Sequence, residues 1–209
     1  KQGAVIAATI MAFGGVAWAL ARTPKTDKVE IVIMELDGGS GTLIRTPSGR
    51  NYLVDAGKVD WRGRFDVGER TLAPAILNQQ VEHLDGIFIT SLLAENIGGL
   101  PFILENFTVD ELYVPFDPAV LLSKKEFTRW DYEDLGGRTR GSGGPHVIAA
   151  VDKIRRIVQE RGIHVVRLEA GTTLRSEIEI RVLGPVDAQV DRYNKMGNAG
   201  LILQIRYGR

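Results

Sequence analysis

The chain has 209 residues, of which 44% are apolar and 25% charged, a composition typical of a globular protein that excludes a disordered one. It carries 26 Lys and Arg against 26 Asp and Glu, so overall charge gives no argument for nucleic-acid binding. The absence of Cys excludes disulfides, Cys-ligated zinc and a thiol nucleophile, and only three His are available for a site built from imidazoles.

Residues 1–22 are predicted to form a transmembrane helix. The run 3–21 is free of charged residues and, at about 1.5 Å per residue, would reach about 28 Å, close to the hydrocarbon thickness of a bilayer. Two alternatives stay open: a cleaved signal peptide, which the Ala-x-Ala spacing of Ala19 and Ala21 would suit, and a buried helix of a soluble protein. Residues 23–28 would then be a short polar linker, whose basic residues weakly favour a cytoplasmic domain.

The rest of the chain, 29–209, alternates strand and helix patterns and is predicted to be one α/β domain. Strands are indicated by β-branched or alternating apolar residues over 29–36, 42–46, 51–55, 84–90, 111–115, 162–168, 177–183 and 201–207. Helices are predicted over 69–80, 101–107, 118–135 and 146–161. Loops rich in glycine or turn-forming residues are predicted over 37–41, 56–68, 91–99 and 136–145.

Two aspartates, Asp37 and Asp55, each end a predicted strand just before a glycine-containing turn. Carboxylates in such places are found in active sites and equally often as residues that stabilise turns, and both interpretations stay open. The glycine-rich stretch 37–41 does not predict a phosphate loop, because a strand rather than a helix follows it and no Gly-Lys-Ser/Thr is present. It predicts a tight corner between two strands.

Several motifs, in order along the chain, resemble the metallo-β-lactamase-fold domain of ComEC-type competence proteins. They are MELDGGSGTLIRTPSGRNYLVDAG, RFDVGERTLAPAIL, HLDGIFITSLLAENIGGLPFILENF and NAGLILQIRYG. The resemblance covers nearly all of 3–209 and is strongest over 29–107. It implies an αββα sandwich, with the sheets inside and the helices outside, that follows a membrane helix. It also implies that the domain over 29–209 is incomplete at its carboxyl end.

The resemblance fails at the metal-binding loop, where the family carries His-x-His-x-Asp-His. Ser91, Leu93, Glu95 and Asn96 stand at those ligand positions, and Thr42 replaces the late Asp of the opening motif. Leu93 has no donor atom and the imidazoles are lost, so a zinc site is not expected. We therefore predict no catalytic residue and no metal or other cofactor. The vestigial active-site positions are Asp37, Asp55, Ser91, Leu93, Glu95 and Asn96.

One alternative keeps a metal at this site. Asp37, Asp55 and Glu95 could hold Mg²⁺ or Ca²⁺ through oxygen ligands, or an atypical site could take Zn²⁺ or Mn²⁺. The histidines do not rescue a zinc site, because none lies at a ligand position of the motif, and we expect them to be structural or solvent-facing. They are His83, His146 and His164.

A modest group of basic residues could contact DNA through its phosphates. The candidates are Arg138 and Arg140 in the loop over 136–145, and Arg155 and Arg156 in the helix after it. The alternative is an ordinary solvated surface, because acidic residues are interspersed nearby.

The resemblance implies a degenerate, non-catalytic domain of a ComEC-like membrane protein associated with DNA uptake. Its partners would be the membrane, DNA and the rest of a polytopic channel protein. Its place would be the cell membrane, with the domain on the extracytoplasmic side. Two further functions stay open: a metal-dependent hydrolase acting on phosphodiesters through an oxygen-ligand site, and a membrane-anchored binding module unrelated to DNA.

Overall fold

The computed structural model describes residues 27–36, 38–60, 62–123, 128, 144–184 and 200–208. The predicted transmembrane helix, most of the linker, Asp37, and the loop with Arg138 and Arg140 lie outside the described residues. Within the described ranges, no helix combines the length and the apolar character that a membrane span requires.

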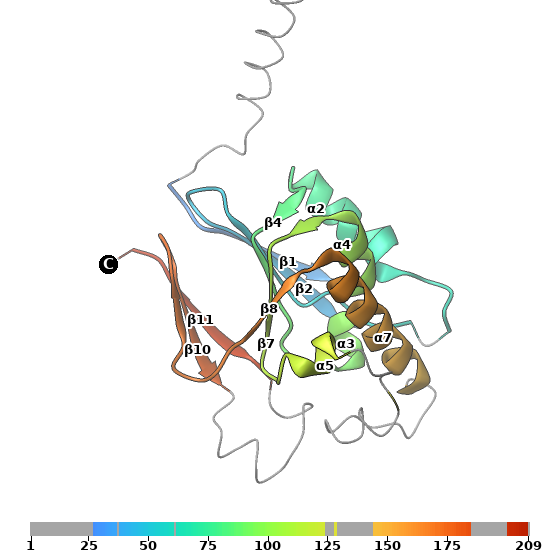
Figure 1. The fold of residues 1–209 in the computed structure, drawn as a ribbon. Coiled ribbons are helices and arrows are strands. Elements are labelled where there is room, and N and C mark those ends of the chain that lie inside the picture. Colours follow the sequence, from blue (N-terminus) through green and yellow to red (C-terminus); the bar gives the residue numbers. More distant parts are fainter. Residues whose placement is uncertain are drawn as a thin grey trace, which may run out of the picture.

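A six-stranded sheet in the order β1-β2-β3-β5-β7-β8 forms the middle of the domain (Figure 1). Strands β1, β2 and β3 form an antiparallel meander, while β3, β5, β7 and β8 are parallel. Their bounds are Glu30–Glu35, Ser40–Arg45, Asn51–Val54, Gly86–Phe88, Glu111–Val114 and His164–Arg167. Strands β1, β3, β5 and β7 therefore run in one direction, and the loops that follow them meet at one edge of the sheet.

A second, antiparallel sheet contains β9 (Thr173–Arg175), β10 (Glu179–Gly184) and β11 (Ile202–Arg206) in the order β11-β10-β9. Short strands β4 (His83–Leu84) and β6 (Thr108–Val109) form a separate parallel pair. The sequence pattern predicted β10 and β11 but not β6 or β9, because two or three residues are too few to show a strand period.

The helices lie against one face of the six-stranded sheet (Figure 1), and each contributes to the same hydrophobic core. They are the π-helical turn η1 (Gly68–Leu72), α2 (Ala73–Asn78), α3 (Ala94–Ile97), α4 (Leu100–Asn106), α5 (Ala119–Leu122) and α7 (Gly144–Arg161). The helix predicted from 69 to 80 is present as η1 and α2 together. Helix α3 falls in a predicted loop, since four residues carry no helical periodicity.

The second sheet covers the opposite face of the six-stranded sheet and closes a second core between the two. Phe88 lies at the centre of this core, fully buried, with its ring stacked on that of Tyr113 at a centroid distance of 4.6 Å. From the second sheet, Ile180 and Val182 point into the same core. The layers are therefore helices, sheet and sheet, which agrees with the predicted sandwich; an outer helical layer on the second sheet does not occur among the described residues.

Strand β1 lies at an end of the six-stranded sheet, and part of its inner face is uncovered. Ile31 is paired with Ile44, which belongs to the core between the sheets. Ile31 is nevertheless 52% exposed and Ile33, on the same face, is 77% exposed. The three described strands of the second sheet thus leave this edge open to solvent.

Candidate functional site

The loops that follow β3 and β5 are joined backbone to backbone at the carboxyl edge of the sheet. The Ala56 amide donates to the Asn96 carbonyl, and the Gly98 amide donates to the Gly57 carbonyl, each at 2.7 Å. Because backbone groups make these bonds, the loops are fixed in place whatever side chains they carry. This is the edge where open α/β sheets commonly bind ligands.

Glycine is required where these loops touch. A Cβ atom on Gly98 would lie 2.0 Å from the Lys58 carbonyl oxygen. In the loop after β1, a Cβ atom on Gly39 would lie 2.5 Å from the Glu95 carbonyl oxygen. Both distances are well inside van der Waals contact with backbone atoms, so no other residue fits without moving a loop.

Asp55, directly after β3, connects this strand end to the loop after β5. Its backbone has a φ of 57°, which is uncommon for a residue other than glycine but tolerated by Asp. Its carboxylate accepts three hydrogen bonds: from the Thr90 amide at 2.8 Å, the Thr90 hydroxyl at 2.7 Å and the Asn96 side-chain amide at 2.8 Å. We call Asp55, Thr90 and Asn96 the carboxylate lock, because together they tie the end of β3 to the loop after β5.

The electrostatics of the lock are dominated by burial. Burial raises the pKa of the Asp55 carboxyl to about 6, against the hydrogen bonds from Thr90 and Asn96, which lower it. The ionised carboxylate is therefore less favourable in the fold than in water, even with three donors facing it.

The structure brings together only some of the predicted site residues. Asp55 and Asn96 are in direct contact, whereas Asp37 lies outside the described residues. Ser91 is buried, Leu93 is half-buried at the start of α3, and Glu95 is exposed. Asn96 also donates to the Thr90 hydroxyl, so its amide nitrogen is occupied twice.

This donor set does not fit a metal site of the kind that the family resemblance would imply. Leu93 offers no lone pair, and both oxygens of Asp55 already accept hydrogen bonds. In the described part of the chain, no three His, Cys, Asp or Glu side chains lie close enough to hold a metal ion.

Sequence reasoning missed Thr90, which supplies two of the three hydrogen bonds to Asp55. Its position directly before the loop motif was the available signal. The Thr90 carbonyl also accepts a hydrogen bond from the Leu201 amide at 3.0 Å, just before β11. The second sheet is thus anchored to the same loop as the lock.

The three histidines lie away from the carboxylate lock, on other elements. His83 pairs with Asp110 at 2.9 Å beside the β4–β6 pair, and His164 lies 3.5 Å from Glu111 on β7. His146 is exposed on α7. The prediction of structural or solvent-facing histidines is confirmed.

The predicted DNA contacts divide into a buried and an exposed residue where the structure describes them. Arg155 is only 4% exposed, and its guanidinium donates to the Ser123 carbonyl at 2.6 Å, so the prediction of a phosphate contact is corrected for this residue. It belongs to the apolar face of α7 and holds the segment after α5. Arg156 is 66% exposed, 3.7 Å from Asp152.

Comparison with known proteins yields no match to a family model or to a curated protein. Solved structures do match. MEM-A1, a subclass B3 metallo-β-lactamase from a soil metagenome library, aligns with a TM-score of 0.50 and 11% identity over 87% of this chain and 55% of its own. A metallo-β-lactamase from Staphylococcus aureus aligns with a TM-score of 0.44 and 9% identity over 86% of this chain and 39% of its own.

An archaeal metallo-β-lactamase superfamily protein, ST1585 from Sulfolobus tokodaii, aligns with a TM-score of 0.44 and 12% identity over 85% of this chain and 59% of its own. The alignment with MEM-A1 identifies the architecture: the chain has the metallo-β-lactamase fold. The chain spans less than two thirds of the length of each of these structures.

Proposed function

We propose that this chain is a degenerate, non-catalytic metallo-β-lactamase-like domain of a ComEC-like membrane protein associated with DNA uptake. The observation that carries the proposal is the carboxylate lock. Asn96, at a ligand position of the family motif, instead donates its amide to Asp55 and Thr90. A side chain in the place of a metal ligand thus serves to hold two loops together.

The remaining positions of the motif support the same proposal. Leu93 offers only hydrocarbon, and the buried Ser91 offers a neutral hydroxyl. Glu95 keeps a charge but is exposed on α3. A metal ion needs several convergent donors and a deprotonated ligand set, and one exposed carboxylate does not supply them.

We expect the purified chain to bind neither Zn²⁺ nor Mn²⁺ tightly and to show no nuclease activity with either ion. The measurements are metal content after dialysis, calorimetric titration and hydrolysis of single- and double-stranded DNA. A variant that restores the family motif (Ser91→His, Leu93→His, Glu95→Asp and Asn96→His) is the positive control for metal binding. Retention of one ion at micromolar affinity, lost in Glu95→Gln, would instead support the metal-dependent hydrolase.

Contact with DNA is proposed through Arg138, Arg140 and Arg156. Binding should be weak and steeply salt-dependent, because each phosphate contact releases counterions. Replacing Arg156 with alanine should reduce the slope of log affinity against log salt by about 1. Arg167→Ala, on β8 beside Glu169, is the matched control. No binding at low salt would remove direct DNA contact and favour a binding module unrelated to DNA.

We also propose that residues 1–22 anchor the domain in the cell membrane, on the extracytoplasmic side, beside the rest of a polytopic channel protein. The charge-free run over 3–21 and the resemblance of its context support this. The orientation can be tested by comparing protease cleavage of the domain in intact cells with its cleavage in inverted membrane vesicles. An extracytoplasmic domain should be cleaved in intact cells and protected in inverted vesicles.

A further inference from the structure

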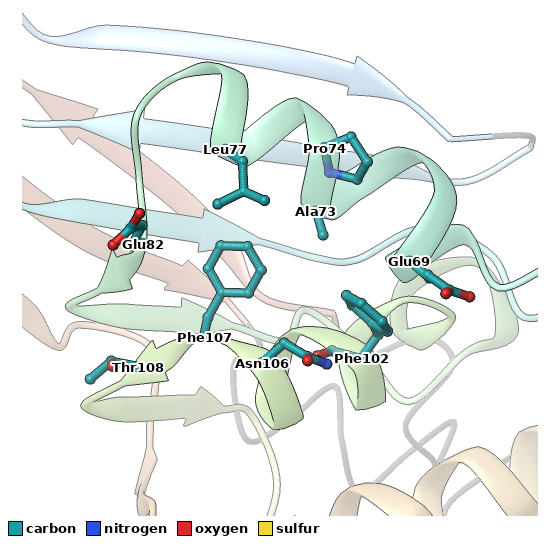
Figure 2. A pocket seen from close by; sticks show the side chains of 9 residues that line it. All are labelled: Glu69, Ala73, Pro74, Leu77, Glu82, Phe102, Asn106, Phe107 and Thr108. Carbon is teal, nitrogen blue, oxygen red and sulfur yellow. The ribbon is translucent and has the colours of Figure 1, made fainter.

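A groove lies on the helical face of the domain, between η1–α2 on one side and α4 with β6 on the other (Figure 2). Its volume is about 480 Å³, within the range of sites that bind a ligand or an anchoring side chain. It is built from helices on the covered face of the sheet, and it shares no lining residue with the carboxylate lock.

The floor and the facing walls of the groove carry apolar side chains, and Asn106 and Thr108 add neutral polar groups to its lining. Phe107 and Ala73 are buried and belong to the first core, so the floor is held rigidly by the fold. Leu77 and Phe102 line the walls from facing helices, with Leu77 50% exposed and Phe102 half-buried. Covering such a pre-formed, partly solvated apolar surface with a further apolar side chain is favourable, because it removes apolar area from water.

The charges at the groove are all of one sign. Glu82 and Glu69 lie at its opposite ends (Figure 2), and no Lys, Arg or His lines it. Neither carboxylate forms an ion pair with any residue in the described ranges. Arg70, next to Glu69 in the chain, lies over the ring of Phe65, 5.7 Å from its centroid.

We propose that this groove binds a cationic amphipathic segment of a protein partner, with an apolar side chain between Leu77 and Phe102 and Lys or Arg side chains at Glu69 and Glu82. Such a segment matches the groove in both hydrophobicity and charge, the pattern of helix-in-groove recognition. The wall formed by η1 and α2 is roughly 15 Å long at 1.5 Å per residue, so it holds two to three turns of a partner helix. Nucleic acid does not fit, because its phosphates would face two carboxylates.

The test uses the 209-residue chain and a synthetic peptide of Leu and Lys with helical spacing, carrying a neutral fluorophore, followed by fluorescence anisotropy. A Leu–Glu peptide of the same spacing and a scrambled Leu–Lys peptide are the probe controls. We expect saturable binding of the amphipathic Leu–Lys peptide alone. The double variant Glu69→Gln, Glu82→Gln should weaken it about tenfold, and Leu77→Ser severalfold.

Matched variants outside the groove distinguish peptide binding at this site from nonspecific binding of the peptide elsewhere on the protein surface. Glu160→Gln removes an exposed carboxylate on α7, and Leu122→Ser removes an exposed apolar side chain on α5. Both should leave the affinity unchanged. All the substituted side chains are exposed, so these variants should fold. The proposal is overturned if the Leu–Lys peptide does not saturate, if the Leu–Glu or scrambled peptide binds equally well, or if the groove variants bind as the controls do.

Discussion

Replacing Gly98 with alanine is expected to destabilise the domain by about 4 kcal/mol or more, which would leave it largely unfolded. Gly98 has φ −58° and ψ −46°, a conformation that alanine adopts without strain. The loss therefore comes only from the added methyl group, which would lie 2.0 Å from the Lys58 carbonyl oxygen and force apart the loops after β3 and β5. Urea unfolding followed by circular dichroism measures the effect.

The control for this substitution is Gly200→Ala. Its methyl group would meet the Thr90 carbonyl oxygen at 3.7 Å, an ordinary contact, and we expect a change within about 0.5 kcal/mol. A Gly98→Ala variant with the stability of Gly200→Ala would mean that the two loops are not held as closely as the structure has them.

Replacing Asp55 with alanine is expected to cost about 3 kcal/mol at pH 5, below the pKa of about 6 that burial gives this carboxyl. The substitution leaves the Thr90 amide without its acceptor, removes one of the two acceptors of the Asn96 side-chain amide, and places alanine at a φ of 57°. Asp55→Asn tolerates this backbone and keeps one acceptor, so it should lose about half as much. An Asp55→Ala variant within 1 kcal/mol of the parent would contradict the role of the lock.

The pKa of Asp55 also sets a direction for the pH dependence of stability. The folded carboxyl has a pKa of about 6 against an ordinary Asp value of 3.8, so between these values the folded state binds the proton more tightly. The contribution of Asp55 to stability is then complete below about pH 4 and falls as pH rises to about 6, by about 2 to 3 kcal/mol in total. The stability difference between the parent and Asp55→Asn, measured from pH 4 to pH 7, should shrink accordingly; a constant difference would exclude the shift.

Most of the α/β order was predictable because the relevant signals are local. The sequence of α7 carries an apolar stripe at Val147, Val151 and Ile154, and the sequence of β10 alternates apolar and polar residues. Each pattern predicts one buried face, and the structure buries those faces. Sheet order was not predictable in this way. The pairing of β7 with β8 joins segments on either side of α7, and it depends on contacts that no local pattern encodes.

The site was predictable in its place but not in its chemistry. The family resemblance grouped Asp55 and Asn96 among the vestigial active-site positions, and the structure brings these two side chains into contact. The direct bond between them and the role of Thr90 depend on the positive φ of Asp55, which turns its carboxylate toward the loop after β5. For Arg155 the predicted surface position was wrong. A charged residue on a helix suggests exposure, but the aliphatic part of this side chain is buried and its guanidinium donates to the Ser123 backbone carbonyl.

The uncovered isoleucines of β1 have a consequence for how this chain behaves at high concentration. Ile31 and Ile33 offer apolar side chains on a strand that has no partner on its outer side among the described strands. An edge strand that presents unpaired backbone N–H and C=O groups and an apolar face can pair with a strand of another molecule. Turbidity and self-association should therefore originate at this end of the sheet, and a lysine at position 33 is the change that would keep the protein in solution.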